Sequence, residues 1–410
     1  MDERSPEQKP SKKTGFDAFF AKVYRPGPLI AIFIVAFVAL VSLGVSLLTE
    51  KTPPPEVIQA GPAASPEPAT PREYEEATSE LEDFVKQADL AIIETLRDLG
   101  LPMADLDLVD VELRRFEGHD YHYQVLQFPK VDNRGQFLVT LRKRLFERLP
   151  DAALFDNGDD EALVQINGRI THRLLLESRP RIIARPEAKG PKLAIVIDDV
   201  GENQALLKGL IALDLPLTFA VWPNASFTRK AVELISQKQR DILVHFPMEP
   251  RGYPKVDPGD DALFVSMSDA ELLDRIRSNL KAIPEAIGVN NHMGSRFTTH
   301  EPGMAVALAE FKRHGLFFLD SMTSPRSVGE SVARSTAISF YKRDTFLDNV
   351  KDVNAIVLQL RKAERVARHN GSAIAIGHPH KATLEALRAW QKTRDPSVSM
   401  ISLSKLPPKQ

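Results

Sequence analysis

The ten residues Lys192-Leu-Ala-Ile-Val-Ile-Asp-Asp-Val-Gly201 decide how the larger part of this chain is expected to fold. Their apolar run, residues 193–197, is short, rich in β-branched side chains and closed by polar residues, which predicts a strand buried on both faces. Asp198 and Asp199 stand at its carboxyl end. Because adjacent carboxylates repel, and more so when desolvated, the pair favours a divalent cation that takes one as ligand and leaves the other as a base. A solvated turn that caps the next helix would also explain such a pair.

From this strand onward, strand-like and helix-like segments alternate. We expect strands at residues 193–197, 217–221, 241–245, 286–289, 316–319, 336–340, 372–376 and 398–403. We expect helices at residues 203–213, 227–237, 269–283, 304–314, 353–368 and 383–392. Such alternation is typical of parallel strands joined by crossover helices, so the segment is α/β. Six or more units predict a distorted (β/α) barrel, with a doubly wound open sheet as the alternative.

Polar side chains gather where the predicted strands end, and parallel α/β folds carry their chemistry at that edge. The strand ends carry Asp198, Asp199, Asn224, His245, Glu249, Asn291, His292, Ser295, Asp320, His378 and His380. So many polar residues on one rim predict a functional site. Imidazole and carboxylate ligands suit zinc or a similar divalent ion, and the chain has no cysteine that could supply a thiolate.

The chemistry that this residue set favours is metal-assisted hydrolysis. Three protein ligands leave one coordination position open for water, and the metal lowers the pKa of that water and polarises a carbonyl. A neighbouring carboxylate takes the proton as the water attacks, and a histidine across the site protonates the leaving group.

These motifs resemble the polysaccharide deacetylase superfamily, and specifically its divergent branch in bacterial envelopes. The resemblance spans about residues 191–406 and rests on Ile-Val-Ile-Asp-Asp-Val-Gly, His-Phe-Pro-Met-Glu-Pro, Asn-Asn-His-Met-Gly-Ser and Gly-His-Pro-His. It implies a deacetylase-type barrel and metal-dependent cleavage of the carbon–nitrogen bond of acetylated amino sugars in an envelope polysaccharide.

The resemblance also implies roles for individual residues. Asp198 matches the general base, and Asp199 and His245 match metal ligands. Asp320 matches an aspartate that orients the catalytic groups, and the acid is His378 or His380.

Two features depart from the ordinary family pattern. Its second ligand histidine is replaced by Glu249, and its Arg-Pro-Pro segment is absent. We infer from its place after the fourth strand that His292 completes the metal site. The other rim residues are candidates for substrate contacts: Asn224, Asn291, Ser295 and Glu249.

The first half of the chain is organised differently. Residues 1–28 form a basic tail, and residues 29–48 are free of charge and long enough to span a membrane. The basic flank predicts a cytoplasmic N-terminus, so we expect one helix in the inner membrane and the later domains in the periplasm. Residues 49–72 contain seven prolines and read as a linker.

Residues 73–180 predict a small α+β domain. The expected helices lie at 75–99 and 136–149, and the expected strands at 106–116, 121–128, 162–166 and 170–176. An Asn167-Gly168 turn joins the last two strands as a hairpin.

The sequence is compatible with two functions. The first is a metal-dependent polysaccharide N-deacetylase, and the retained base and acid favour it. The second is a catalytically inactive glycan-binding or scaffolding protein, and the missing arginine and replaced histidine favour it. A metallo-phosphoesterase is disfavoured because no glycine-rich phosphate loop is present. The formal charge of −2 gives no field that would attract nucleic acid.

Overall fold

The computed structural model describes residues 80–103, 106–116, 119–128, 131, 133–158, 161–176 and 190–408. Within these ranges no helix is both long and apolar enough to cross a membrane. The predicted basic tail, membrane span and proline-rich linker all lie outside the described residues.

The second half of the chain is built on a parallel sheet with the order β11-β10-β9-β8-β7-β6-β13-β12, and β14 pairs beside β6. Its strands are β6 (Lys192–Val200), β7 (Thr218–Val221), β8 (Ile242–Met248), β9 (Gly288–Met293), β10 (Phe317–Asp320), β11 (Phe340–Lys342), β12 (Thr345–Phe346), β13 (Ser372–Gly377) and β14 (Ser399–Met400). The opening motif forms β6, which lies inside the sheet between β7 and β13.

The two outermost strands of this sheet, β11 and β12, are consecutive in the chain. Only Arg343 and Asp344 join them, so their facing ends lie within about 11 Å of each other. The backbone N–H of Arg343 donates to Asp320 O of β10 at 3.0 Å, and that of Asp344 donates to Ile374 O of β13 at 2.8 Å. The sheet is therefore curled until one short connection bridges its edges, which supports the predicted barrel over an open doubly wound sheet.

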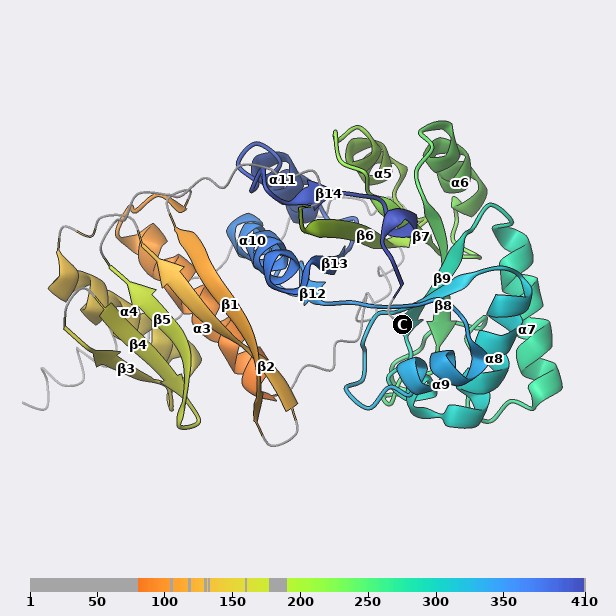
Figure 1. The fold of residues 1–410 in the computed structure, drawn as a ribbon, viewed down its shortest axis with the longest axis horizontal. Coiled ribbons are helices and arrows are strands. Elements are labelled where there is room, and N and C mark those ends of the chain that lie inside the picture. Colours follow the sequence, from red (N-terminus) through yellow and green to blue (C-terminus); the bar gives the residue numbers. More distant parts are fainter. Residues whose placement is uncertain are drawn as a thin grey trace, which may run out of the picture. The chain divides into compact units, whose positions relative to one another are not determined.

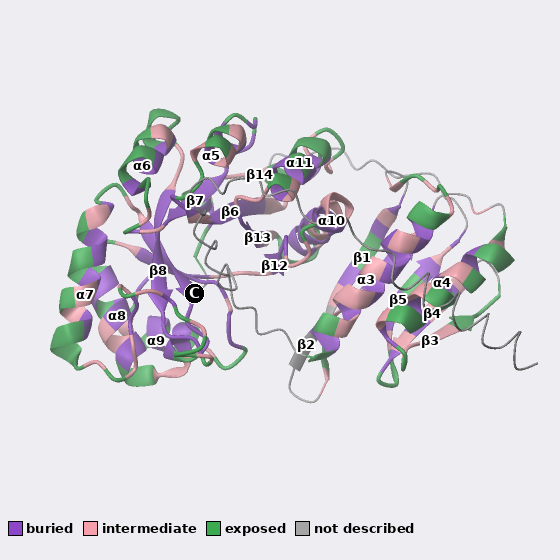
Figure 2. Cartoon of the chain, turned by 180° about the vertical axis from the view of Figure 1, so that it is seen from behind, coloured by how far each residue is buried: buried purple, intermediate pink, exposed green. Residues whose placement is uncertain are grey.

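Helices cover the outside of the curled sheet (Figure 1). They are α5 (Gln204–Ile211), α6 (Thr228–Gln237), α7 (Asp269–Ala282), α8 (Glu301–Arg313), α9 (Gly329–Thr336), α10 (Val353–Asn370) and α11 (Lys381–Trp390). Figure 2 shows their buried sides toward the strands and their exposed sides outward, as amphipathic helices require. The predicted strand at 336–340 is wrong, because α9 continues to Thr336 and β11 begins only at Phe340.

Alternation along the strands divides the core into two clusters. In β6, Leu193, Ile195 and Ile197 belong to the cluster shared with the helices, whereas Ala194 and Val196 belong to a second cluster. The second cluster fills the inside of the curled sheet and consists of Ala194, Val196, Ala220, Leu243, Phe317, Leu319, Tyr341, Phe346, Ile374, Ile376, Leu403 and Leu406. Because side chains alternate along a strand, the next inward position of β6 after Val196 is Asp198.

Residues 80–176 form a separate five-stranded sheet with the order β1-β2-β5-β4-β3. Its elements are α3 (Glu80–Asp98), β1 (Asp107–Phe116), β2 (His119–Gln127), α4 (Arg134–Arg148), β3 (Ala153–Asp156), β4 (Glu161–Ile166) and β5 (Arg169–Leu175). Strand β3 was not predicted. The buried ammonium of Lys362 on α10 donates to Glu82 of α3 at 3.0 Å, and Arg365 on α10 pairs with Asp107 of β1 at 3.2 Å.

Candidate metal centre

Asp198 and Asp199 reach the same site by two different routes. Asp198 points into the barrel because of strand alternation, and it is buried. Asp199 would face outward by the same rule, but the register of β6 shifts between Ile197 and Val200, and Asp199 adopts φ +52°. A non-glycine residue in the left-handed region stores strain that is typical of functional sites. The bulge therefore brings two consecutive carboxylates to one place.

Three potential ligand atoms form a small triangle on the inner rim. His245 Nε2 and His292 Nδ1 each lie 3.0 Å from Asp199 Oδ1, and the two nitrogens lie 3.1 Å apart. Ligands bound to zinc at about 2.05 Å in tetrahedral geometry stand about 3.3 Å apart. The spacing of these atoms thus fits a small divalent ion.

Hydrogen bonds to Asn290 define how His245 is protonated. The Asn290 amide nitrogen lies 2.8 and 2.9 Å from the two oxygens of Asp198, and its Oδ1 lies 2.9 Å from His245 Nδ1. An ionised carboxylate only accepts hydrogen bonds, so the NH₂ group faces Asp198 and the amide oxygen faces the imidazole. His245 therefore carries a proton on Nδ1 and turns Nε2 toward Asp199.

This arrangement requires a cation between His245 and Asp199. An unprotonated Nε2 facing a carboxylate oxygen at 3.0 Å would place two acceptors against each other, so either a proton or a metal ion lies there. Burial disfavours charge on His245, but Asp198 and Asp199 raise its pKa above the ordinary value. Burial opposes the charge of Asp199 too, yet His292 and His245 hold the pKa of that carboxyl well below its usual range. The donor set thus fits the divalent ion that we predicted from the sequence.

His378 faces Asp199 from the neighbouring strand and is held by a residue that we did not predict. His378 Nε2 lies 3.8 Å from Asp199 Oδ2, and His378 Nδ1 lies 2.9 Å from Asp348 Oδ1. Thr383 Oγ1 donates to the other oxygen of Asp348 at 2.7 Å. Burial disfavours charge on His378, but Asp348, Asp199 and Asp198 outweigh it and raise its pKa to about 9. In the metal-free site this raised pKa favours the protonated imidazole at neutral pH, which is the form that a general acid needs.

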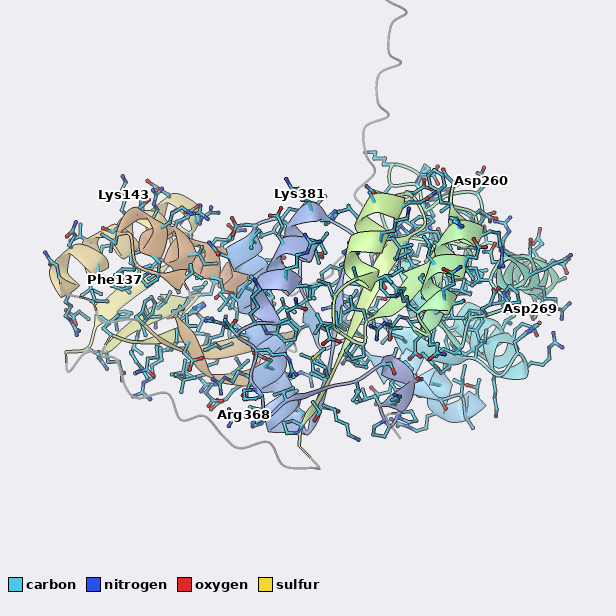
Figure 3. All side chains as sticks on the ribbon, turned by 90° about the horizontal axis from the view of Figure 1, so that it is seen from above. Phe137, Lys143, Asp260, Asp269, Arg368 and Lys381 are labelled. Atoms are coloured by element: carbon cyan, nitrogen blue, oxygen red, sulfur yellow. The ribbon has the colours of Figure 1, made fainter. Side chains whose placement is uncertain are left out.

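A cleft of about 650 Å³ opens in front of these groups. It is lined by Asp199, Glu202, Asn203, Leu206, Trp222, Asp257, Pro258, Gly259, His292, Met293, His378, Pro379, His380 and Lys381. Trp222 forms its wall beside the candidate metal ligands: the indole N–H donates to Asp199 Oδ1 at 2.8 Å, and its ring centroid lies 4.3 Å from that of His292. In Figure 3, Lys381 of the cleft wall lies on the same side of the ribbon as Asp260, and Arg368 lies on the opposite side.

His380 also belongs to the cleft wall. Its ring stacks on that of His378 with centroids 5.9 Å apart, and the residue is the N-cap of α11. Asp348, His378 and His380 form a second group whose ligand-type atoms lie within 4.8 Å of one another. Both Asp348 oxygens already accept hydrogen bonds, from the side chain and backbone of His378 and from Thr383, so the first group is the better candidate for a metal.

Asp320 and Glu249 do not face the candidate metal. Asp320 accepts hydrogen bonds from the Met322 N–H at 2.8 Å and the Ser327 hydroxyl at 2.6 Å, which holds the loop after β10. Glu249 is buried between Arg296, at 2.6 Å, and the Val265 N–H, at 2.7 Å. The orienting contact that we expected from Asp320 is made to His378 by Asp348 instead.

The other three residues that we considered for substrate contacts also hold loops. Asn224 is exposed and donates to Asp261. Asn291 accepts from the Ser321 N–H at 2.9 Å and donates to Met293 O at 2.7 Å, and Ser295 accepts from the Arg251 N–H at 2.9 Å. None of the three lines the cleft described above.

Three residues of the site were missed from the sequence: Asn290, Asp348 and Trp222. Strand alternation could have revealed Asn290, because it stands two positions before His292 and so shares its face. Trp222 directly follows β7, so its place at a strand end was visible in the sequence, but we selected Asn224 there instead. Asp348 follows the two-residue strand β12, which leaves too short a pattern to detect.

Comparison with known proteins agrees with this fold. The model of the divergent polysaccharide deacetylase family matches residues 195–407. The chain belongs to this family, which confirms the resemblance drawn from the motifs.

The chain is similar to two bacterial proteins and shares its fold with a solved structure. The protein YibQ of Escherichia coli (strain K12) is 34% identical over 215 residues, which are 52% of this chain and 67% of that protein. An uncharacterized protein of Haemophilus influenzae (strain ATCC 51907 / DSM 11121 / KW20 / Rd) is also 34% identical, over 52% of this chain and 76% of that protein. The crystal structure of the uncharacterized protein ATU2773 from Agrobacterium tumefaciens C58 shares the fold, with a TM-score of 0.51 and 24% identity over 54% of this chain and 91% of that one.

Proposed function

We propose that this protein is a metal-dependent N-deacetylase that acts on acetylated amino sugars of an envelope polysaccharide. The observation that carries the proposal is the triangle of Asp199, His245 and His292. A buried carboxylate, Asp198, lies 3.8 Å from His245 Nδ1, and a buried imidazole, His378, lies 3.8 Å from Asp199 Oδ2. A glycan-binding protein without turnover would have no need for both a base and an acid beside a metal site.

Each group of the site has a task in hydrolysis of an acetamide. A divalent ion held by Asp199, His245 and His292 supplies Lewis-acid chemistry, which polarises a carbonyl and activates water. Asp198 accepts the proton of the attacking water, and burial supports this by raising the pKa of Asp198 against the opposing effect of His245 and His378. His378 donates its proton to the leaving amine, while Asp348 keeps the ring in place.

The cleft supports a carbohydrate substrate. Its wall presents the indole of Trp222 beside the candidate metal ligands, and its rim carries polar groups of Glu202, Asn203 and Asp257. An aromatic face and several hydrogen-bonding groups suit the apolar and polar sides of a sugar ring.

The cellular setting forms part of the proposal. The charge-free run at 29–48 and its basic flank support an inner-membrane anchor with the catalytic part in the periplasm. There the enzyme would meet polymeric envelope glycans rather than cytoplasmic sugars.

The test combines metal content with acetate release. Full-length protein in detergent is freed of metal with a chelator, reloaded with zinc, and incubated with acetylated envelope glycans. We expect about one zinc per chain and acetate release that chelation abolishes and zinc restores. Binding of a glycan by zinc-loaded protein without acetate release from any glycan would instead establish the scaffolding function.

A further inference from the structure

We propose that Asn290 is a positioning residue that ties the metal ligand His245 to the base Asp198, so that one amide sets the geometry of both. This inference rests on the proposed function, because it names the residue that contacts both the metal ligand and the base of that site. The residue was not among those predicted from the sequence.

The amide is held on all sides. Its oxygen accepts from His245 Nδ1 at 2.9 Å, and its nitrogen lies 2.8 and 2.9 Å from the oxygens of Asp198 and 3.2 Å from Ser321 Oγ. One N–H is thus shared by the Asp198 carboxylate and the other is directed to Ser321. Asn290 is fully buried, so water does not replace a partner that is lost.

The rigidity of an amide makes the two contacts interdependent. Oxygen and nitrogen are attached to one planar carbon, so the group cannot turn toward His245 without moving its N–H away from Asp198. A flip of the amide would place its NH₂ against the Nδ1–H of His245 and its oxygen against a carboxylate. Both contacts would then be repulsive, which leaves a single orientation.

This orientation prepares the site for a cation. The Nδ1–H bond to Asn290 keeps the lone pair of His245 Nε2 on the side of Asp199 and His292. Outer partners of this kind, which hold a ligand imidazole in one tautomer, typically contribute 10- to 100-fold in metal affinity. The NH₂ group of the same amide holds both oxygens of Asp198 at hydrogen-bonding distance, and Asp198 Oδ2 lies 3.8 Å from His245 Nδ1.

Two substitutions separate the two contacts. Asn290→Asp keeps an acceptor for His245 but removes the N–H donors to Asp198. Asn290→Ala removes both. We expect zinc affinity in Asn290→Asp to equal or exceed that of the wild type, and in Asn290→Ala to fall about 10- to 100-fold. Acetate release at saturating zinc should fall in both variants, by up to the 10²–10⁴-fold that a general base contributes.

The tautomer is read directly in zinc-loaded protein labelled with ¹⁵N-histidine. We expect a slowly exchanging Nδ1–H proton for His245 in the wild type and in Asn290→Asp, and its loss in Asn290→Ala. Asn291→Ala is the matched control, because Asn291 is equally buried on the same strand but bonds to Ser321 N and Met293 O. It should lose stability yet keep the His245 signal and zinc affinity.

Two results would overturn the proposal: wild-type zinc affinity in Asn290→Ala, or a proton on Nε2 rather than Nδ1 in the zinc-loaded wild type. Neither readout needs turnover. Absence of acetate release from the wild type would therefore reject the deacetylase function while leaving the role of Asn290 open to its own test.

Discussion

Asp348 holds His378 through two hydrogen bonds, which we call the clamp. His378 Nδ1 lies 2.9 Å from Asp348 Oδ1, and the backbone N–H of His378 donates to Asp348 Oδ2 at 2.5 Å. Both residues are buried, so the contact is protected from screening by water. The clamp fixes both the direction of the ring and its charge.

The clamp predicts a pH-dependent contribution to stability. The folded-state pKa of His378 is raised to about 9, above an unfolded value of about 6.5. Its contribution should be fully present below pH 6.5 and lost as the pH rises toward 9. In metal-free protein, Asp348→Asn should therefore be less stable than the wild type at pH 6, by at most about 3 kcal/mol from this source, and the difference should shrink by pH 9.5. Urea unfolding at both pH values measures the difference in unfolding free energy between the variant and the wild type. The same difference at pH 6 and at pH 9.5 would contradict this role of Asp348.

The acid should be His378 rather than His380. His378 Nε2 lies 3.8 Å from Asp199 Oδ2, and Asp348 holds its other ring nitrogen, whereas His380 is the N-cap of α11 on the cleft wall. We expect His378→Ala to lower amide hydrolysis by about 10²–10⁴-fold while sparing an activated ester, whose leaving group needs no proton. His380→Ala serves as the comparison and should affect both substrates alike. The reverse pattern would assign the acid to His380.

Asp198 should act as the base without being needed for metal. It accepts from Asn290, and it does not belong to the group of three residues whose ligand atoms lie together. Asp198→Asn should lower acetate release by about 10²–10⁴-fold and retain zinc and glycan binding, because asparagine has nearly the same shape. Asp199→Asn is the matched change at the next residue and should lose zinc. Full activity of Asp198→Asn would remove this residue from the mechanism.

Glu249 should matter for stability rather than for metal. It replaces a ligand histidine of the ordinary family pattern, but its carboxylate is buried and bonded to Arg296 and to the Val265 N–H. Glu249→Gln should therefore retain zinc at wild-type affinity and lose about 1.5–3 kcal/mol of unfolding free energy. Metal analysis checks the zinc affinity, and urea unfolding checks the loss of unfolding free energy. Loss of zinc from a folded variant would restore Glu249 to the ligand set.

The proposed topology predicts the location of the catalytic part. A reporter fused after Gln410 should be active when it is of a type that functions only in the periplasm, and inactive when it is of a cytoplasmic type. Replacement of three apolar residues within 29–48 by lysine should abolish the difference, since a charged segment no longer inserts. Activity of the cytoplasmic reporter on the intact chain would contradict the envelope substrate.

Sequence patterns predicted most of the elements that place the site. Residues 193–197 predicted the central strand β6, because an apolar β-branched run closed by polar residues can be recognised from local sequence. The alternation that follows also predicted a parallel sheet with helices outside, since connection rules leave few other arrangements. Asp198, Asp199, His245, His292 and His378 were singled out because parallel strands end at one edge, and the structure brings them together.

The direction in which a side chain points, and the residue that it contacts, could be read only from the tertiary structure. Asp320 is the last residue of β10, and Asp348 follows β12. Asp348 bonds to His378 because β12 pairs with β13, which lies about thirty residues farther along the chain. Likewise, a left-handed backbone at Asp199 turns its side chain into the site against the alternation of β6. Local sequence encodes which residues form strands and helices. The curling of the sheet, which joins its edges at Arg343 and Asp344, decides which polar groups meet inside it, because that contact depends on segments far apart in the chain.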